Sequence, residues 1–178
     1  QLCGDVLAVG VEDNQARLRS EIQFWNLQEP ETPRPLSHLT IRRRGAKDDQ
    51  TAGAVGLVQR ERDHVLAVAN WDSRAIDFYR SDGKPLQDPG CRFSFAARWD
   101  GGKADRSDWE PDGLSGSYQA INLVRDALGD LYLLGFYTAA PSKDVVDLFQ
   151  VSIDREAVRL KKQANKHVIL SDGNRFQY

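Results

Sequence analysis

The segment from Arg98 to Ser117 holds the densest group of side chains that could bind a ligand. Within about 20 residues it carries two tryptophans and five acidic residues, and a loop of this length inside a compact domain is often functional. Tryptophan rings stack on sugars and cations, and carboxylate oxygens accept hydrogen bonds from them. We therefore predict that Trp99 and Trp109 bind a ligand. The alternative is a solvated loop whose tryptophan rings pack back onto the domain.

The same loop offers oxygen ligands for calcium. Hard cations take several oxygen ligands, and the glycines of this loop would let its backbone bend around an ion. The candidate metal ligands are Asp100, Asp105, Asp108 and Asp112. Their spacing differs from that of the helix–loop–helix calcium motif, so the prediction is either calcium or no cofactor.

A shorter loop, Asn70–Arg74, adds further candidates for ligand binding. It contributes Trp71, Asp72 and Arg74, and Tyr137 precedes another loop of the same kind. An ion pair at a strand end is the alternative for Asp72 and Arg74. Trp71 could likewise cover the core instead of meeting a ligand.

Signatures of known enzymes are missing from the sequence. His38, His64 and His167 lie far apart and have no metal-binding spacing. The Gly-x-Ser-x-Gly elbow of hydrolases and the phosphate-binding P-loop are also absent. We therefore predict a non-enzymatic module that uses its loop face for binding or as a scaffold. The alternative is a hydrolase or lyase with a divalent metal held by carboxylates of that face.

A repeated pattern indicates which elements position these loops. Three short apolar strands each precede a loop and a second strand that is rich in β-branched and aromatic residues: Asp5–Gly10, His64–Ala69 and Asp130–Gly135. The first two contain the matching sequences Asp-Val-Leu-Ala-Val and His-Val-Leu-Ala-Val. Measured at Val6, Val65 and Leu131, the pattern recurs after about 59 and then about 66 residues.

Flanking strands complete a unit of four antiparallel strands. The additional predicted strands are Leu36–Ile41, Ala54–Val58, Arg92–Ala96 and Tyr118–Val124. The approximate units are residues 1–45, 53–99 and 117–170, and the first unit begins at its second strand. Four-stranded units that recur every roughly 40 to 60 residues are typical of β-propeller blades.

Two segments resemble propeller repeats. Ile22–Leu27, Ile-Gln-Phe-Trp-Asn-Leu, resembles the third strand of a WD-repeat blade, and Ile76–Gly83 resembles blades of lactonase-like and phytase-like propellers. The resemblance implies an all-β fold of about three blades, with the candidate ligand residues gathered on one loop face. A β-sandwich is the alternative fold. An α+β fold would need a helix within Ser152–Leu170, where Val158 and Leu160 alternate as a strand would.

Composition excludes several classes of protein. The 178 residues include 24 basic and 26 acidic side chains, so no basic excess points to nucleic acid. No apolar run approaches the roughly 18–20 residues that cross a bilayer. A hydrophobic content of 40% excludes intrinsic disorder. The partners that remain are a protein, a small molecule or a carbohydrate.

The sequence contains no Met, and three blades do not close a propeller, which typically needs about four to eight. We therefore expect the chain to be part of a larger propeller chain, the remainder of which is a further partner. Cys3 and Cys91 allow one disulfide, as in secreted or periplasmic proteins, or two thiols, as in cytosolic ones. Both alternatives stay open.

Overall fold

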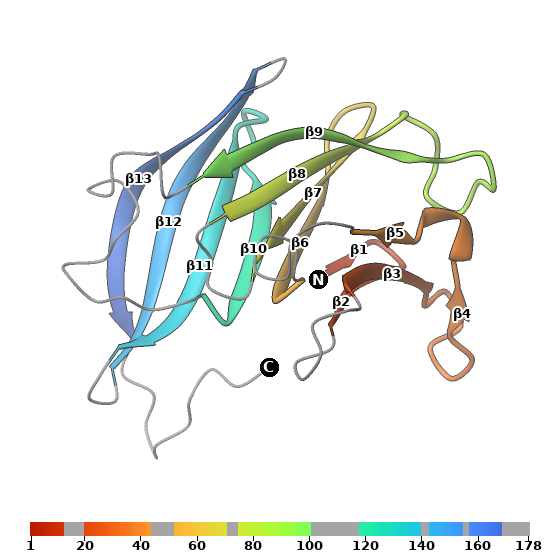
Figure 1. The fold of residues 1–178 in the computed structure, drawn as a ribbon, viewed down its shortest axis with the longest axis horizontal. Coiled ribbons are helices and arrows are strands. Elements are labelled where there is room, and N and C mark those ends of the chain that lie inside the picture. The colour runs from red at the N-terminus through yellow and green to blue at the C-terminus, as the bar shows by residue number, and fades with distance from the viewer. Residues whose placement is uncertain are drawn as a thin grey trace.

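The computed structural model describes residues 1–12, 20–43, 52–70, 75–100, 118–139, 143–154 and 157–168. These residues form three antiparallel sheets and no α-helix, which confirms the predicted all-β fold (Figure 1). The sheets are not closed into a ring, and their arrangement is compatible with propeller-like blades or with a β-sandwich. No helix in the described part of the chain is long and apolar enough to cross a membrane.

The first sheet is built around two seven-residue strands. Its elements are β1 (Leu2–Cys3), β2 (Val6–Glu12), β3 (Ser20–Asn26), β4 (Arg34–Pro35), the 3-10 helix η1 (Ser37–Leu39) and β5 (Ile41–Arg42). β1 pairs with β2, so the first unit begins with a short first strand instead of starting at its second. β4 and β5 pair with successive parts of β3 and together take the position of a fourth strand.

The predicted continuous strand over Leu36–Ile41 is wrong. The chain forms two-residue strands on either side of η1 instead. Proline has no N–H group to donate to a strand ladder, and Pro33 and Pro35 lie at this point of the chain. The edge of the first sheet is therefore interrupted, and buried Leu39 anchors the interruption to the core.

The second and third sheets each have four strands in sequence order. The second contains β6 (Ala54–Gln59), β7 (His64–Ala69), β8 (Ala75–Ser81) and β9 (Phe93–Asp100). The third contains β10 (Ala120–Arg125), β11 (Leu131–Ala139), β12 (Lys143–Asp154) and β13 (Ala157–Val168). Because β13 is a strand, the helix considered for this region is excluded.

The pairing register corrects the sequence alignment of the third unit. Val58 of β6 pairs with Val65, and Val124 of β10 pairs with Tyr132. Tyr132, and not Leu131, therefore corresponds to Val65. The turn 126–130 is one residue longer than the turn 60–63, and a slip of one residue exchanges the two faces of a strand. The faces of the third sheet are assigned below from this register.

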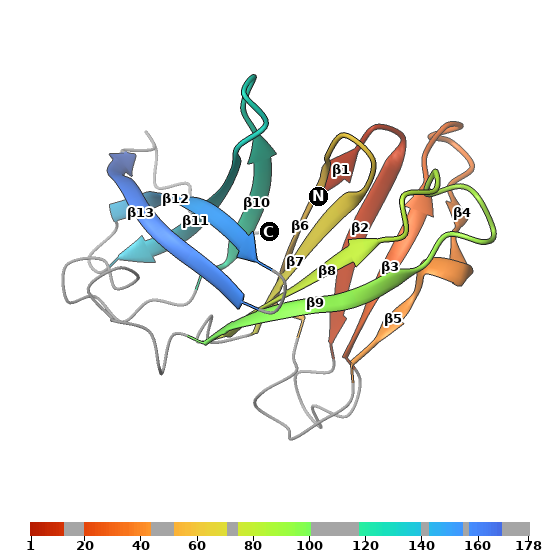
Figure 2. The same cartoon turned by 90° about the horizontal axis from the view of Figure 1, so that it is seen from above.

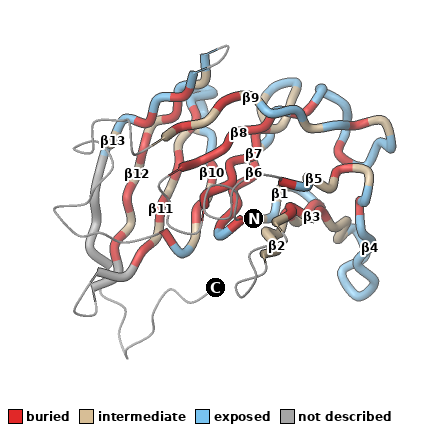
Figure 3. Tube along the Cα trace, in the orientation of Figure 1, coloured by how far each residue is buried: buried red, intermediate tan, exposed pale blue. Residues whose placement is uncertain are grey.

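The second sheet lies between the other two and is buried on both faces (Figures 2 and 3). On one face Val55, Leu66 and Val68 pack with the first sheet. On the other face Ala67 and Phe78 pack with the third sheet. Because both faces of the sheet are buried, β7 is an almost uninterrupted run of apolar residues. A strand with one exposed face would alternate apolar and polar residues.

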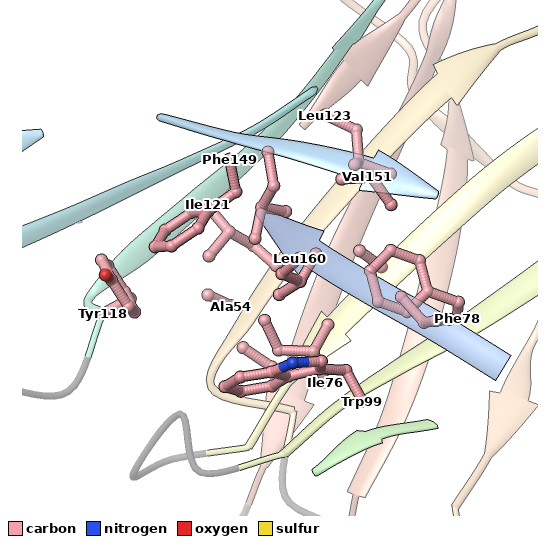
Figure 4. Close-up of a cluster of buried hydrophobic side chains, with 14 of the residues drawn as sticks. Ala54, Ile76, Phe78, Trp99, Tyr118, Ile121, Leu123, Phe149, Val151 and Leu160 are labelled. Atoms are coloured by element: carbon pink, nitrogen blue, oxygen red, sulfur yellow. The ribbon is translucent and has the colours of Figure 1, made fainter. Parts of the chain in front are cut away.

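The cluster between the second and third sheets is rich in large side chains. Figure 4 shows Ile76, Phe78 and Trp99 of the second sheet in this cluster with Phe149 and Leu160 of the third. The first strands of the two sheets also approach closely. A Cβ atom on Gly56 of β6 would lie only 2.9 Å from the backbone nitrogen of Leu123 in β10, so only glycine fits without a shift.

Phe78→Ala tests how strongly this cluster holds the sheets together. Phe78 is fully buried, so we expect the free energy of unfolding to fall by about 3–5 kcal/mol, as in other large-to-small core substitutions. Phe95 of the same sheet is 58% exposed and forms a T-shaped pair with Tyr79, so Phe95→Ala serves as the control, with a loss of about 1 kcal/mol. Urea denaturation measures both values, and equal losses would contradict the described packing.

Both cysteines are free thiols, which answers the question left open by the sequence. Burial, followed by the nearby Asp82 carboxylate, raises the pKa of Cys91 to about 11. Burial also raises the pKa of Cys3, whose side chain is only partly covered. The thiolate is the reactive form, so Cys91 is protected by both its pKa and its burial.

Thiol labelling tests this assignment. We expect iodoacetamide at pH 8 to modify Cys3 of the native chain well before Cys91, with both thiols reacting after denaturation. Mass spectrometry of tryptic peptides identifies the modified residue. Cys3→Ser should remove the faster phase, and a chain without any free thiol in denaturant would contradict the structure.

Candidate functional site

The predicted ligand face lies at the end of the sheets where β2 ends and β6 and β10 begin. Most residues predicted for it lie outside the described residues: Trp71, Asp72, Arg74, Asp105, Asp108, Trp109 and Asp112. Three others are described, namely Trp99, Asp100 and Tyr137. Ligand binding by this set, and calcium binding by its carboxylates, stay predictions.

The described aromatic members of this set pack inside the protein. Trp99 near the end of β9 is 5% exposed, and Tyr137 near the end of β11 is 1% exposed. The Tyr137 ring meets the Tyr118 ring edge to face, with ring centroids 5.4 Å apart. Asp100 is half-buried and pairs with Ala75 in the ladder of the second sheet. Trp99 and Tyr137 therefore belong to the hydrophobic core at this end of the sheets.

A groove of about 530 Å³ opens at the same end of the sheets. It is formed by the middle of β2, the beginning of β6 and the beginning of β10, together with residues beside these strands and one residue of β11. The residues that line it are Gln1, Leu7, Ala8, Val9, Gly10, Gly53, Ala54, Val55, Gln119, Ala120, Ile121, Asn122 and Phe136. No side chain in this set is charged. Nothing in the sequence pointed to the groove, because its walls are ordinary strand residues.

Amide side chains supply the polar groups of this groove. The side-chain amide of Gln1 is hydrogen-bonded to the backbone of both neighbouring strands. Its Nε2 donates to the Leu123 carbonyl at 2.9 Å, and its Oε1 accepts from the N–H groups of Leu57 and Leu123. It thereby bridges the facing edges of β6 and β10. Gln119 is exposed and Asn122 is half-buried, so both present amides along the wall of the groove.

A buried carboxylate joins the first and second sheets. Asp77 of β8 accepts from Arg43, which follows β5, at 2.5 Å, and from Arg98 of β9 at 2.6 Å and 3.0 Å. Arg43 also donates to the Asn70 side chain at 3.1 Å. The side chains of Arg43 and Asp77 are 1% and 4% exposed, so little water screens their attraction.

A second buried carboxylate lies in the third sheet. Asp147 of β12 is fully buried and accepts from the Tyr118 hydroxyl at 2.6 Å and from Lys162 of β13 at 3.2 Å. Burial and then the Asp147 charge raise the pKa of Tyr118 far above its usual range, so the hydroxyl keeps its proton and donates it. The Tyr118 ring lies across Gly135, where an added Cβ would clash with it.

Asp77 and Asp147 occupy the same register position in their sheets. Asp77 pairs with Val68 and Asp147 pairs with Gly135, and these partners correspond once the third sheet is aligned on Val124 and Tyr132. Sequence reasoning missed this correspondence because the one-residue slip hid it. The available signal was an Asp in the middle of an apolar third strand, where a carboxylate needs cationic partners.

A hollow of about 730 Å³ lies at the opposite end, between the first and second sheets. It contains Cys3 and His64 beside charged residues of both signs, including an Asp82–Lys84 ion pair at 3.6 Å. Burial lowers the pKa of His64 and raises that of Cys3, so both side chains are neutral near pH 7. Neither is therefore activated as a cation or a thiolate nucleophile.

The described residues contain no group of three or more His, Cys, Asp or Glu side chains that could hold a metal ion. No known protein family and no curated protein matches the chain. The groove and the two buried carboxylates are thus the features from which a function has to be argued.

Neutralising Asp77 tests the buried cluster. Asp77→Asn would leave two arginines without their counter-charge, so we expect a loss of about 3–5 kcal/mol in the free energy of unfolding. Glu29→Gln makes the same chemical change in an exposed ion pair with Arg34 and should cost less than about 1 kcal/mol. Both values come from denaturant unfolding. A small effect at Asp77 would show that its charge is not needed for stability.

Proposed function

We propose that the chain is a propeller-like binding module whose ligand enters the groove between β2, β6 and β10. The observation that supports this most directly is the groove itself: the first or second strands of all three sheets converge on one hollow of about 530 Å³. Its volume falls within the roughly 300–1,000 Å³ typical of small-molecule sites. It also opens at the end of the sheets where the sequence predicts ligand binding.

The lining of the groove favours an uncharged ligand. The walls combine small apolar side chains and the Phe136 ring with the amides of Gln119 and Asn122. Apolar walls bury the body of a ligand, and a few amide groups orient it through hydrogen bonds. A carbohydrate without acidic groups has both kinds of surface and carries no charge. We therefore propose a neutral oligosaccharide or a similar polyhydroxylated molecule as the ligand.

The propeller assignment rests on three features. Each sheet has its strands in sequence order, the second sheet is covered on both faces by its neighbours, and β6 contacts both β2 and β10. Successive blades of a propeller have these features, with their first strands nearest the common axis. A sandwich would instead bury one face of each of its sheets.

Filling the groove tests the proposal. Ala120 lines the groove, whereas Ala127 is exposed in the turn between β10 and β11, so Ala120→Trp and Ala127→Trp are matched variants. We expect a panel of neutral oligosaccharides to contain a ligand whose affinity falls more than about ten-fold in Ala120→Trp and stays unchanged in Ala127→Trp. Glycan-array binding followed by calorimetry measures this. A panel without any ligand, or equal affinities in both variants, would overturn the proposal.

A further inference from the structure

Each sheet turns one face toward the next sheet along the chain and one toward the preceding sheet. We call these the forward face and the backward face. The forward face of the first sheet packs on the backward face of the second, and the forward face of the second packs on the backward face of the third. Among the described residues, the backward face of the first sheet and the forward face of the third are left uncovered by any strand.

Both uncovered faces carry a group of apolar side chains, beside polar ones such as Asn122, Gln150 and Lys161 on the third sheet. On the first sheet, the backward face carries Leu2, Leu7, Val9, Val11 and Trp25, of which Leu2 is 56% exposed and the others are half-buried. On the third sheet, the forward face carries Val124, Tyr132, Leu134, Phe136, Val146 and Leu148, all half-buried except Val124, which is 38% exposed. Apolar side chains gathered on a sheet face that no other strand covers make that face a candidate interaction surface.

The pairing register gives the kind of surface that fits each uncovered face. Forward faces have a common pattern, since Val6, Ala8, Ile22 and Phe24 of the first sheet correspond to Val65, Ala67, Ile76 and Phe78 of the second. Backward faces also match, since Val55 and Leu57 of the second sheet correspond to Ile121 and Leu123 of the third. Within the chain, a forward face packs on a backward face at both junctions. The two uncovered faces are one of each kind.

Polar residues extend this correspondence. On the backward faces of the second and third sheets, Asp77 and Asp147 receive donors from Arg43 and Tyr118, which lie in the segments leading from the preceding sheet. At the same register position of the first sheet stands Gln23, which pairs with Val9. Its Nε2 donates to Glu21 at 2.6 Å, and Glu21 is only 8% exposed. The uncovered backward face therefore also carries a polar pair where the other two receive a neighbour.

We propose that two copies of this chain associate head to tail, with the forward face of the third sheet of one copy on the backward face of the first sheet of the other. The new junction would continue the two junctions already present within the chain. Such a contact is heterologous, so it gives a closed ring if the rotation between copies closes and an open fibre if it does not. A second copy provides the required pair of faces without any other protein, and the inference does not require the groove to bind a ligand.

Charge substitutions that avoid the groove test the association. Trp25 lies on the uncovered backward face and Leu148 on the uncovered forward face, and neither lines the groove. We expect the unmodified chain to sediment as a dimer or larger species between about 1 and 100 µM. Trp25→Lys and Leu148→Lys should each weaken this association more than about ten-fold. Leu128→Lys, at a position 89% exposed in a turn, should leave it unchanged.

Mixing the two variants separates head-to-tail association from other arrangements. Trp25→Lys keeps an unmodified forward face, and Leu148→Lys keeps an unmodified backward face. Neither variant alone can form the junction, but a mixture of the two has one pair of unmodified faces and should form a heterodimer. If identical faces met instead, one of the variants would still associate on its own, which would overturn the head-to-tail proposal. A chain that stays monomeric over the whole concentration range would overturn it as well.

Two further variants guard against misfolding. Leu2 and Val124 are the most exposed apolar residues of the two faces, so Leu2→Lys and Val124→Lys would perturb the monomer least. They should reproduce the loss of association while the circular dichroism spectrum stays that of the unmodified chain. Association that persists in both of these variants would also contradict the proposal. Since none of the four substituted positions lines the groove, oligosaccharide binding can be measured in the same proteins as a separate readout.

Discussion

The burial of both faces of the second sheet is the constraint on which the rest of the structure depends. β7 and most of β8 have apolar side chains pointing in both directions, so this sheet can leave neither face in water. At about 25 cal/mol per Å² of apolar surface, each uncovered face of such a sheet would cost many kcal/mol. A neighbouring sheet is therefore required on either side. This requirement sets the order of the three sheets and brings β2, β6 and β10 together.

Hydrophobic contact alone does not specify how neighbouring sheets are oriented, because it has no direction. Asp77 and Asp147 add directional contacts, because a buried carboxylate is tolerated only when hydrogen-bond donors lie at the correct distance from its oxygens. Arg43 reaches Asp77 from the end of the first sheet, and Tyr118 reaches Asp147 from the start of the third. These contacts hold the connecting segments against the sheets and so define the end of the molecule at which the groove opens.

The strands could be predicted from the sequence, whereas the contacts between them could not. Asp5–Gly10 and His64–Ala69 have the same apolar pattern, and such patterns determine strands locally. The third unit was misaligned because one added turn residue moves every side chain of the next strand to the other face. The pair of Arg43 and Asp77 spans 34 positions of the chain, and nothing local in the sequence announces it. The sequence predicts Trp99 in a ligand-binding loop, whereas the structure buries it in the core.

The groove and the two uncovered faces share side chains, which couples the two proposed activities. Leu7 and Val9 belong both to the groove and to the uncovered backward face, and Phe136 belongs both to the groove and to the uncovered forward face. A second copy on these faces would enclose the groove and lower its local dielectric constant. Hydrogen bonds from Asn122 to a ligand would then be stronger, because water competes less for the same groups. By linkage, a ligand that binds more tightly in the enclosed groove must favour association by the same factor.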